Sequence, residues 1–233
     1  MYNWFYNPEI QFNMWDFTHL LTIIIGCGLI IFIFLFRIQL LPYRRAIRLS
    51  TGILLVLSRI SLDIWYINTG MWDIKSSLPF ELCSISSLAC AVMLFTKSHR
   101  LFEVFYFLAI GGAIQAIITP DLFFGFPQFR YIQFFVDHFM LLLAPLLMIW
   151  LYHFTITLKS LLKAFITINV IAVIIFAINH LLSANYMFLK SKPSGGSLLD
   201  FLGPYPWYLL SLEAITLGIF FLLYLPFLAK KLG

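Results

Sequence analysis

Charged residues are scarce in this chain: Asp, Glu, Lys and Arg make up 11% of its 233 residues, whereas 62% are hydrophobic. At a mean hydropathy of +0.95, a soluble domain of this length would aggregate, which excludes the soluble protein classes. Only three cysteines are present, which is too few for a disulfide framework. The composition predicts a polytopic integral membrane protein.

The chain also lacks the two-residue alternation of a membrane β-strand, and it shows no internal repeat. Because hydrocarbon offers no partner to a free backbone amide, its apolar runs are expected to be helices. We predict an all-α bundle of seven transmembrane helices that forms a single domain over residues 1–233. Runs of about 20 apolar residues, the length needed to cross the hydrocarbon, occur near residues 17–36, 47–67, 79–95, 101–119, 131–151, 161–182 and 207–228.

Basic residues are missing from residues 1–16, as is a small-residue cleavage site. We therefore expect no removable signal peptide and a retained first span. Ten of the 15 Lys and Arg residues fall on one side of the predicted membrane and four on the other, which predicts an N-terminus outside and a C-terminus in the cytosol. The net charge of +5 is explained by the cytosolic side, where anionic lipid headgroups suffice as partners. The basic residues form no stripe, so no nucleic acid partner is expected.

Few ionisable residues lie inside the predicted spans, and placing each of them in the membrane costs free energy. One such group near the centre of a membrane costs about 2.5–3.5 kcal/mol on insertion scales. The inner half of the spans is almost purely apolar, so these groups are expected to converge on a wet cavity that opens outward. Six of them are expected to line this cavity: Arg59, Asp63, Glu81, Asp137, His138 and Glu213.

Simpler roles are open for most of these groups. Arg59 and Asp63 stand four residues apart on one helical face, which favours a local ion pair. Asp137 could pair with Arg130, seven residues earlier. Glu81 could bond to a neighbouring helix, or it could cap the first turn of a helix that Pro79 starts.

Cys83, in the fragment "LPFELCSIS", shares the outer layer with His138. A thiol becomes a useful nucleophile when an imidazole takes its proton, and a carboxylate such as Glu213 could hold the imidazole tautomer. Zinc binding by His138, His180 and Glu213 is the competing interpretation. No HxxxH or HExxH spacing supports it, so neither a metal nor a cofactor is predicted.

Four fragments carry a resemblance to a known family. The chain resembles the YwaF-type bacterial integral membrane proteins, which are similar to the animal transmembrane protein 164 family, from about Leu78 to Phe227. The resemblance implies a seven-span acyltransferase of the bacterial cell membrane, acting on phospholipids with Cys83 and His138 as the catalytic pair. The fragments are "LPFELCSIS", "GGAIQAIITPDLFFGFPQFRYIQFFVDH", "NYMFLKSKP" and "SLLDFLGPYPWYLLSLE".

The implied chemistry is an enzyme reaction through an acyl-thioester. His138 deprotonates Cys83, and the thiolate attacks the ester of a phospholipid and releases a lysophospholipid. A second lysophospholipid, or water, then takes the acyl chain. The supporting residues in this hypothesis are Glu81, Asp137 and Glu213, Gln115 and Asn179 as oxyanion donors, and Arg59 or Arg130 as ligands of the lipid phosphate.

Two other classes of function fit the same buried polar groups. A proton-coupled or small-solute transporter also carries ionisable residues within its bundle, although the apolar inner half gives a relay few polar residues. A noncatalytic lipid-binding protein could use the outer cavity without turnover. Substitution of Cys83 distinguishes these classes, because only the enzyme would lose turnover while binding persists.

Overall fold

The structure is a computed structural model that describes residues 5–193 and 198–232. Its described residues form no β-strand beyond an isolated bridge between Gln11 and Phe124, which confirms the all-α class. Seven α-helices and three short 3-10 helices make up the described chain. They are α1 (Phe17–Leu35), η1 (Leu41–Tyr43), α2 (Arg44–Thr69), α3 (Leu82–Thr96), α4 (His99–Ile118), α5 (Phe129–Tyr152), α6 (Leu158–Leu182), η2 (Tyr186–Phe188), η3 (Leu198–Leu202) and α7 (Trp207–Leu232).

Each of the seven predicted ranges falls on one helix. The prediction that Pro79 starts the third helix is wrong, because α3 begins at Leu82. The amide of Phe80 instead bonds to the Leu78 carbonyl at 2.8 Å in a tight turn, and Glu81, with extended backbone, occupies the N-cap position.

Five helices are long and apolar enough to cross a membrane: α1, α4, α5, α6 and α7. By length and composition, these five helices fit the predicted multi-pass membrane protein. Helix α3 has 15 residues and spans about 22 Å, less than the ~30 Å hydrocarbon layer. Helix α2 has 26 residues, but its mean apolarity is low because it carries charged side chains at both its start and its middle.

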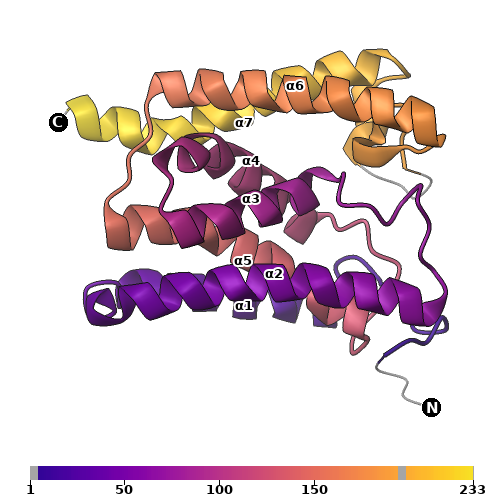
Figure 1. Cartoon of the computed structure of the whole chain (residues 1–233), viewed down its shortest axis with the longest axis horizontal. Helices are drawn as coiled ribbons and strands as arrows, with labels where there is room; N and C mark the ends of the chain where they lie inside the picture. Colours follow the sequence, from indigo (N-terminus) through magenta and orange to yellow (C-terminus); the bar gives the residue numbers. More distant parts are fainter. Residues whose placement is uncertain (1–4, 194–197, 233) are drawn as a thin grey trace.

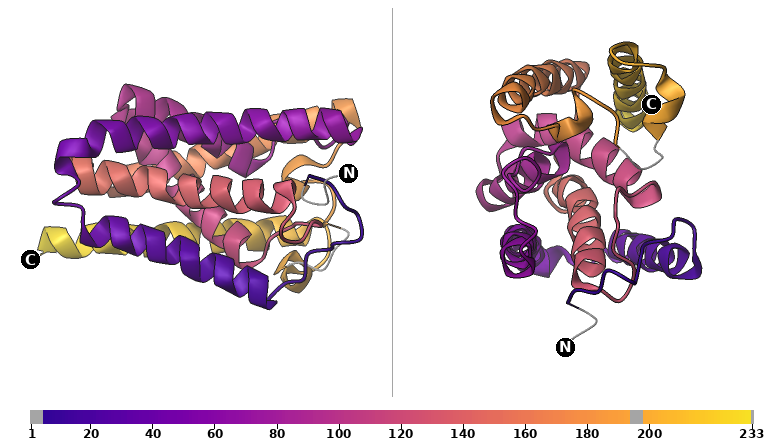
Figure 2. Two further views of the ribbon diagram at one scale, coloured as in Figure 1. Left: turned by 90° about the horizontal axis from the view of Figure 1, so that it is seen from below. Right: turned by 90° about the vertical axis from the view of Figure 1, so that its right-hand side faces the viewer.

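The helices run alternately up and down, and the chain termini lie at opposite ends of the bundle (Figures 1 and 2). One end, which we call the long-loop end, carries residues 5–16, 70–81, 119–128, 183–193 and 198–206. The other, the short-loop end, carries residues 36–43, 97–98 and 153–157. Helices α1, α3, α5 and α7 start at the long-loop end.

Helix α5 lies at the centre of the bundle and contacts α1, α2, α3 and α4. Of an 18-residue stretch in α5, 67% is buried, compared with 6% in α7. Fully buried side chains from α3, α4 and α5, such as Leu94, Phe107 and Leu141, form one apolar core. The outer helices instead expose large apolar side chains, as helices in contact with lipid do.

Two arginines on α2, Arg48 and Arg59, have hydrogen-bond or ion-pair partners within the bundle. Arg48 is buried, and its guanidinium donates to the Tyr152 hydroxyl at 3.1 Å and to the Phe95 carbonyl at 3.2 Å. Arg59 forms an ion pair with Asp63, as the four-residue spacing predicts. These bonds tie α2 to α3 and α5 and lower the cost of placing its charges among apolar helices.

Candidate functional site

Cys83 is the second residue of α3, directly after the N-cap Glu81 and Leu82. The Glu81 side chain makes no capping bond; its Oε2 instead accepts a hydrogen bond from the Met187 amide at 3.0 Å. The predicted capping role of Glu81 is therefore wrong, and its carboxylate anchors the loop that contains η2. The first-turn amides of α3 are left free of a side-chain cap beside the partly exposed Cys83 thiol.

The thiol of Cys83 lies close to α4 at Gly112. A Cβ atom added at Gly112 would lie 3.8 Å from the Cys83 sulfur, which is an ordinary van der Waals distance, so α3 and α4 pack closely at the candidate nucleophile.

His138 is buried in α5, and one of its ring nitrogens has a fixed role. Its Nδ1 lies 2.7 Å from the Phe134 carbonyl. A carbonyl oxygen can only accept a hydrogen bond, so Nδ1 carries the proton and Nε2 of the neutral ring holds a lone pair. Among the described residues, Nε2 has no hydrogen-bond partner. The lone pair on Nε2 is therefore not used by another group of the described chain.

A hydrogen bond between α3 and α5 brings Cys83 and His138 into one layer. The Ser87 hydroxyl donates to Asp137 at 2.9 Å, and both helices run from the long-loop end (Figure 1). Cys83 precedes Ser87 by one turn, and the His138 ring lies back over Phe134, about one turn before Asp137. No hydrogen bond joins the sulfur to the ring within the described part of the chain, so the catalytic pair stays a prediction.

Arg130 does not pair with Asp137. Its guanidinium donates to the Gln133 side chain at 2.8 Å and lies over the Phe134 ring. Gln133 in turn donates to the Ser58 hydroxyl on α2 at 2.9 Å. The predicted alternative of an Arg130–Asp137 ion pair is therefore wrong, and Asp137 is instead committed to α3.

Arg59 reaches the amino end of α3. Besides its ion pair with Asp63, it donates to the Ser77 carbonyl at 2.7 Å and to the Ser84 hydroxyl at 3.4 Å. Ser84 directly follows Cys83. Arg59 thus ties α2 to the residue next to the candidate nucleophile.

Three predicted supporting residues lie elsewhere or already have partners. Glu213 on α7 accepts a hydrogen bond from Asn169 on α6 at 3.0 Å. The amide of Asn179 is buried and bonds to both backbone polar groups of Tyr186, at 2.8 and 2.9 Å. Gln115 is exposed on α4.

Sequence reasoning missed Tyr186, which organises the long-loop end. Its buried hydroxyl donates to the Ile74 carbonyl at 2.7 Å and accepts from the Leu78 amide at 3.1 Å. Burial raises the pKa of this phenol above its ordinary value, so the hydroxyl remains a donor. Tyr186 thereby fixes residues 74–78, which lead into α3. No sequence motif indicates this role.

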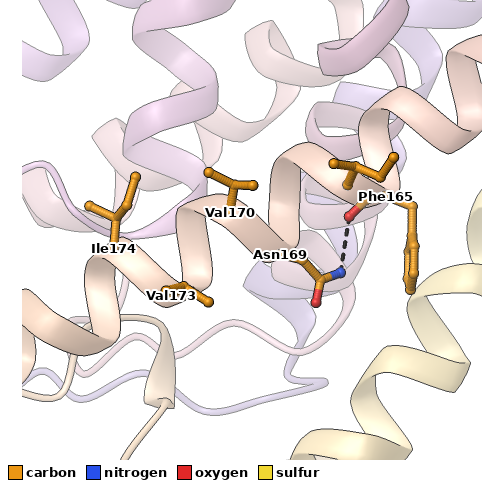
Figure 3. A pocket seen from close by; sticks show the side chains of 6 residues that line it. Phe165, Asn169, Val170, Val173 and Ile174 are labelled. Atoms are coloured by element: carbon orange, nitrogen blue, oxygen red, sulfur yellow. Dashed lines mark hydrogen bonds between the residues drawn. The ribbon is translucent and has the colours of Figure 1, made fainter.

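Two hollows among the described residues are lined by neither Cys83 nor His138. One of about 310 Å³ lies at the long-loop end between residues 6–12 and 122–124. The other, of about 380 Å³, is an apolar hollow on α6 lined by Phe165, Ile166, Asn169, Val170, Val173 and Ile174. Figure 3 shows the Asn169 amide in this hollow bonding to the Phe165 carbonyl. The predicted wet cavity around the site residues stays a prediction.

No group of three His, Cys, Asp or Glu side chains within residues 5–193 and 198–232 is placed to hold a metal ion. The Cys83 thiol at the start of α3, the His138 ring and the Arg59 guanidinium are the groups of this region that the predicted nucleophilic chemistry would use.

The family model of the TMEM164 family matches residues 11–224 of the chain. No curated protein and no solved structure matches it.

Proposed function

Because the chain belongs to the TMEM164 family, we propose that it is a membrane-embedded acyltransferase that moves an acyl chain between phospholipids through a thioester on Cys83. The observation that carries the proposal is the placement of Cys83 at the uncapped start of α3, in the same layer as a His138 ring whose Nδ1 is already committed. The substrates are membrane phospholipids and lysophospholipids, and no cofactor is needed.

The reaction begins with proton transfer from the Cys83 thiol to Nε2 of His138. The free amides and the positive dipole end of α3 stabilise the resulting thiolate. The sulfur attacks the ester carbonyl, the C–O bond breaks, and the imidazolium returns its proton to the departing lysophospholipid oxygen. A second lysophospholipid hydroxyl then attacks the thioester, with His138 again as the base, and releases the Cys83 thiol. Water in place of that hydroxyl gives a free fatty acid.

Other site residues position the lipid and the two helices. Asp63 and the Ser77 carbonyl hold Nε and Nη2 of Arg59. Its Nη1, which bonds only to the Ser84 hydroxyl at 3.4 Å, is the nitrogen that would donate a charge-assisted hydrogen bond to the phosphate. Arg130, in the first turn of α5, is the candidate for a second phosphate ligand. Asp137 keeps α3 and α5 in register through Ser87.

We further propose that all seven helices cross the membrane, with the N-terminus outside and the C-terminus in the cytosol. The opposite placement of the termini (Figure 1) supports an odd number of crossings. The internal partners of Arg48 and Arg59 support the crossing of α2. Arg37, Arg44 and Arg45 lie at or next to the short-loop end, where the positive-inside rule places the cytosol. The proposed location is a bacterial plasma membrane, with residues 1–233 as one YwaF-type domain.

The proposal is tested by acyl exchange in proteoliposomes that contain a phospholipid with one labelled chain and an unlabelled lysophospholipid. We expect the wild type to label the acceptor and Cys83→Ala to transfer nothing. Cys27→Ala is the matched control, since Cys27 is exposed on α1, and it should transfer at the wild-type rate. A wild type that neither transfers the label nor releases labelled fatty acid across several headgroups contradicts the proposal.

Noncatalytic lipid binding is a second candidate function, favoured by the apolar hollow on α6. Its shape and lining suit an acyl chain and contribute no nucleophile. In this case the wild type and Cys83→Ala would bind labelled phospholipid equally, and neither would turn it over.

A further inference from the structure

The buried hydroxyl of Ser86 makes no hydrogen bond to the described residues. It is fully buried, and within residues 5–193 and 198–232 its Oγ is the one buried side-chain nitrogen or oxygen without a hydrogen-bond partner. Helical hydroxyls elsewhere in the chain bond back to a carbonyl four residues earlier, as Thr22, Thr51 and Thr96 do. An unsatisfied hydroxyl is costly in an apolar interior. Its presence in the candidate layer therefore calls for a partner that arrives during the reaction.

The position of Ser86 relates it to the nucleophile. It follows Cys83 by three residues on α3, so the two side chains share a helical face with Cβ atoms about 5–6 Å apart. Helical side chains lean toward the amino end of the helix, which directs the Ser86 hydroxyl toward the layer of Cys83. The neighbouring Ser87 is already committed to Asp137.

The geometry of a tetrahedral intermediate fits this spacing. In this intermediate the sulfur is bonded to the former carbonyl carbon, and the oxyanion is bonded to the same carbon. The oxyanion can therefore lie between the Cys83 side chain and the side chain one helical turn further along α3. A donor attached to Cys83's own helix, one turn on, is rigidly placed to meet it. The Asn179 amide, the earlier candidate for this role, would first have to give up both of its bonds to Tyr186.

We propose that Ser86 is the oxyanion donor of the acyl-transfer reaction, an inference that rests on the proposed function. When the Cys83 sulfur attacks the ester carbonyl, the π electrons of the C=O bond move to the oxygen, and the Ser86 hydroxyl donates a hydrogen bond to it. When the C–O bond to the lysophospholipid breaks, those electrons re-form the C=O bond of the thioester. Ser86 keeps its proton throughout, and the proton from Cys83 passes through His138 to the leaving group.

The test is Ser86→Ala in the proteoliposome exchange assay, with kcat, KM and melting temperature measured together. Loss of an oxyanion donor lowers kcat by about 10²–10³-fold, and KM should stay near the wild-type value. The melting temperature should stay the same or rise, since the substitution removes an unsatisfied hydroxyl. Because the melting temperature is expected to stay the same or rise with or without a catalytic role, kcat decides the test: a wild-type kcat in Ser86→Ala overturns the role of Ser86.

Two control variants and one conservative variant sharpen the result. Ser87→Ala removes the partner of Asp137 and should lower the melting temperature. Ser61→Ala, on α2 where the hydroxyl bonds back to Ser58, should change neither kcat nor the melting temperature. Ser86→Cys keeps a weaker donor and should give a kcat between those of Ser86→Ala and the wild type.

The failures of the two proposals are distinguishable. Full kcat in Ser86→Ala, with no transfer by Cys83→Ala, overturns the role of Ser86 and leaves the acyltransferase proposal standing. An inactive wild type, or an active Cys83→Ala, overturns both.

Discussion

Two regions near the long-loop end each bury a histidine, and they use it differently. Where α1 meets the end of α4, the ring of His19 is fully buried and both nitrogens are committed. Its Nε2 donates to the Ile117 carbonyl at 3.0 Å, and its Nδ1 accepts from the Trp15 amide at 3.1 Å. Between α3 and α5, His138 commits Nδ1 alone. Burial of a histidine therefore does not by itself mark a reactive site. The two rings differ in that one nitrogen of His138 has no hydrogen-bond partner among the described residues.

The largest expected effect comes from His138→Ala. Loss of a general base lowers a rate by about 10²–10⁴-fold, and we expect this fall in acyl transfer. Removal of the buried ring leaves a cavity, but the melting temperature should fall less than in His19→Ala, because the Phe134 carbonyl is still bonded within α5. The measurement is the exchange assay together with thermal unfolding in the same detergent. Transfer at the wild-type rate would place His138 in the same structural class as His19.

His19→Ala should show the reverse pattern. The substitution leaves the Ile117 carbonyl and the Trp15 amide without their partner, which costs about 1–3 kcal/mol in stability. Transfer per folded molecule should be unchanged, and the measurement is denaturant unfolding alongside the exchange assay. Loss of transfer with normal stability would contradict the assignment of a purely structural role to His19.

The smallest effect is expected at the short-loop end, where polar groups are paired and face solvent. Lys163 donates to Glu103 at 2.7 Å with 55% of its side chain exposed. Surface pairs of this kind contribute about 0–1 kcal/mol and are screened by salt. Lys163→Met should therefore shift the melting temperature by a degree or two at low salt and less at high salt. A large loss of transfer in this variant would extend the functional region beyond the layer of Cys83.

The positions of the helices could be predicted from the sequence because apolar length is a local property of the chain. The Arg59–Asp63 pair was predictable for the same reason, since four-residue spacing places both groups on one helical face. The start of α3 was not, because a turn at Leu78 and Phe80 replaces the helical start expected at Pro79.

Hydrogen bonds between different helices could not be predicted, because they depend on how the helices pack, and no local sequence pattern shows that packing. Asp137 bonds to Ser87, fifty residues earlier in the chain, and Glu213 bonds to Asn169 on α6. The sequence placed Cys83 and His138 in one layer by their depth, and the bond between α3 and α5 supports that layer. The positions of Ser86 and Ser87 near Cys83 could have been predicted, because residues three and four positions apart share a helical face.

The most direct test of the account is the mass of the protein after incubation with a phospholipid that carries one defined acyl chain, without an acceptor. The account predicts an acyl adduct on the peptide that contains Cys83, removed by hydroxylamine and absent from Cys83→Ala. His138→Ala should form the adduct much more slowly than the wild type. Acyl transfer without an adduct on Cys83, or with the adduct on another residue, would contradict the account.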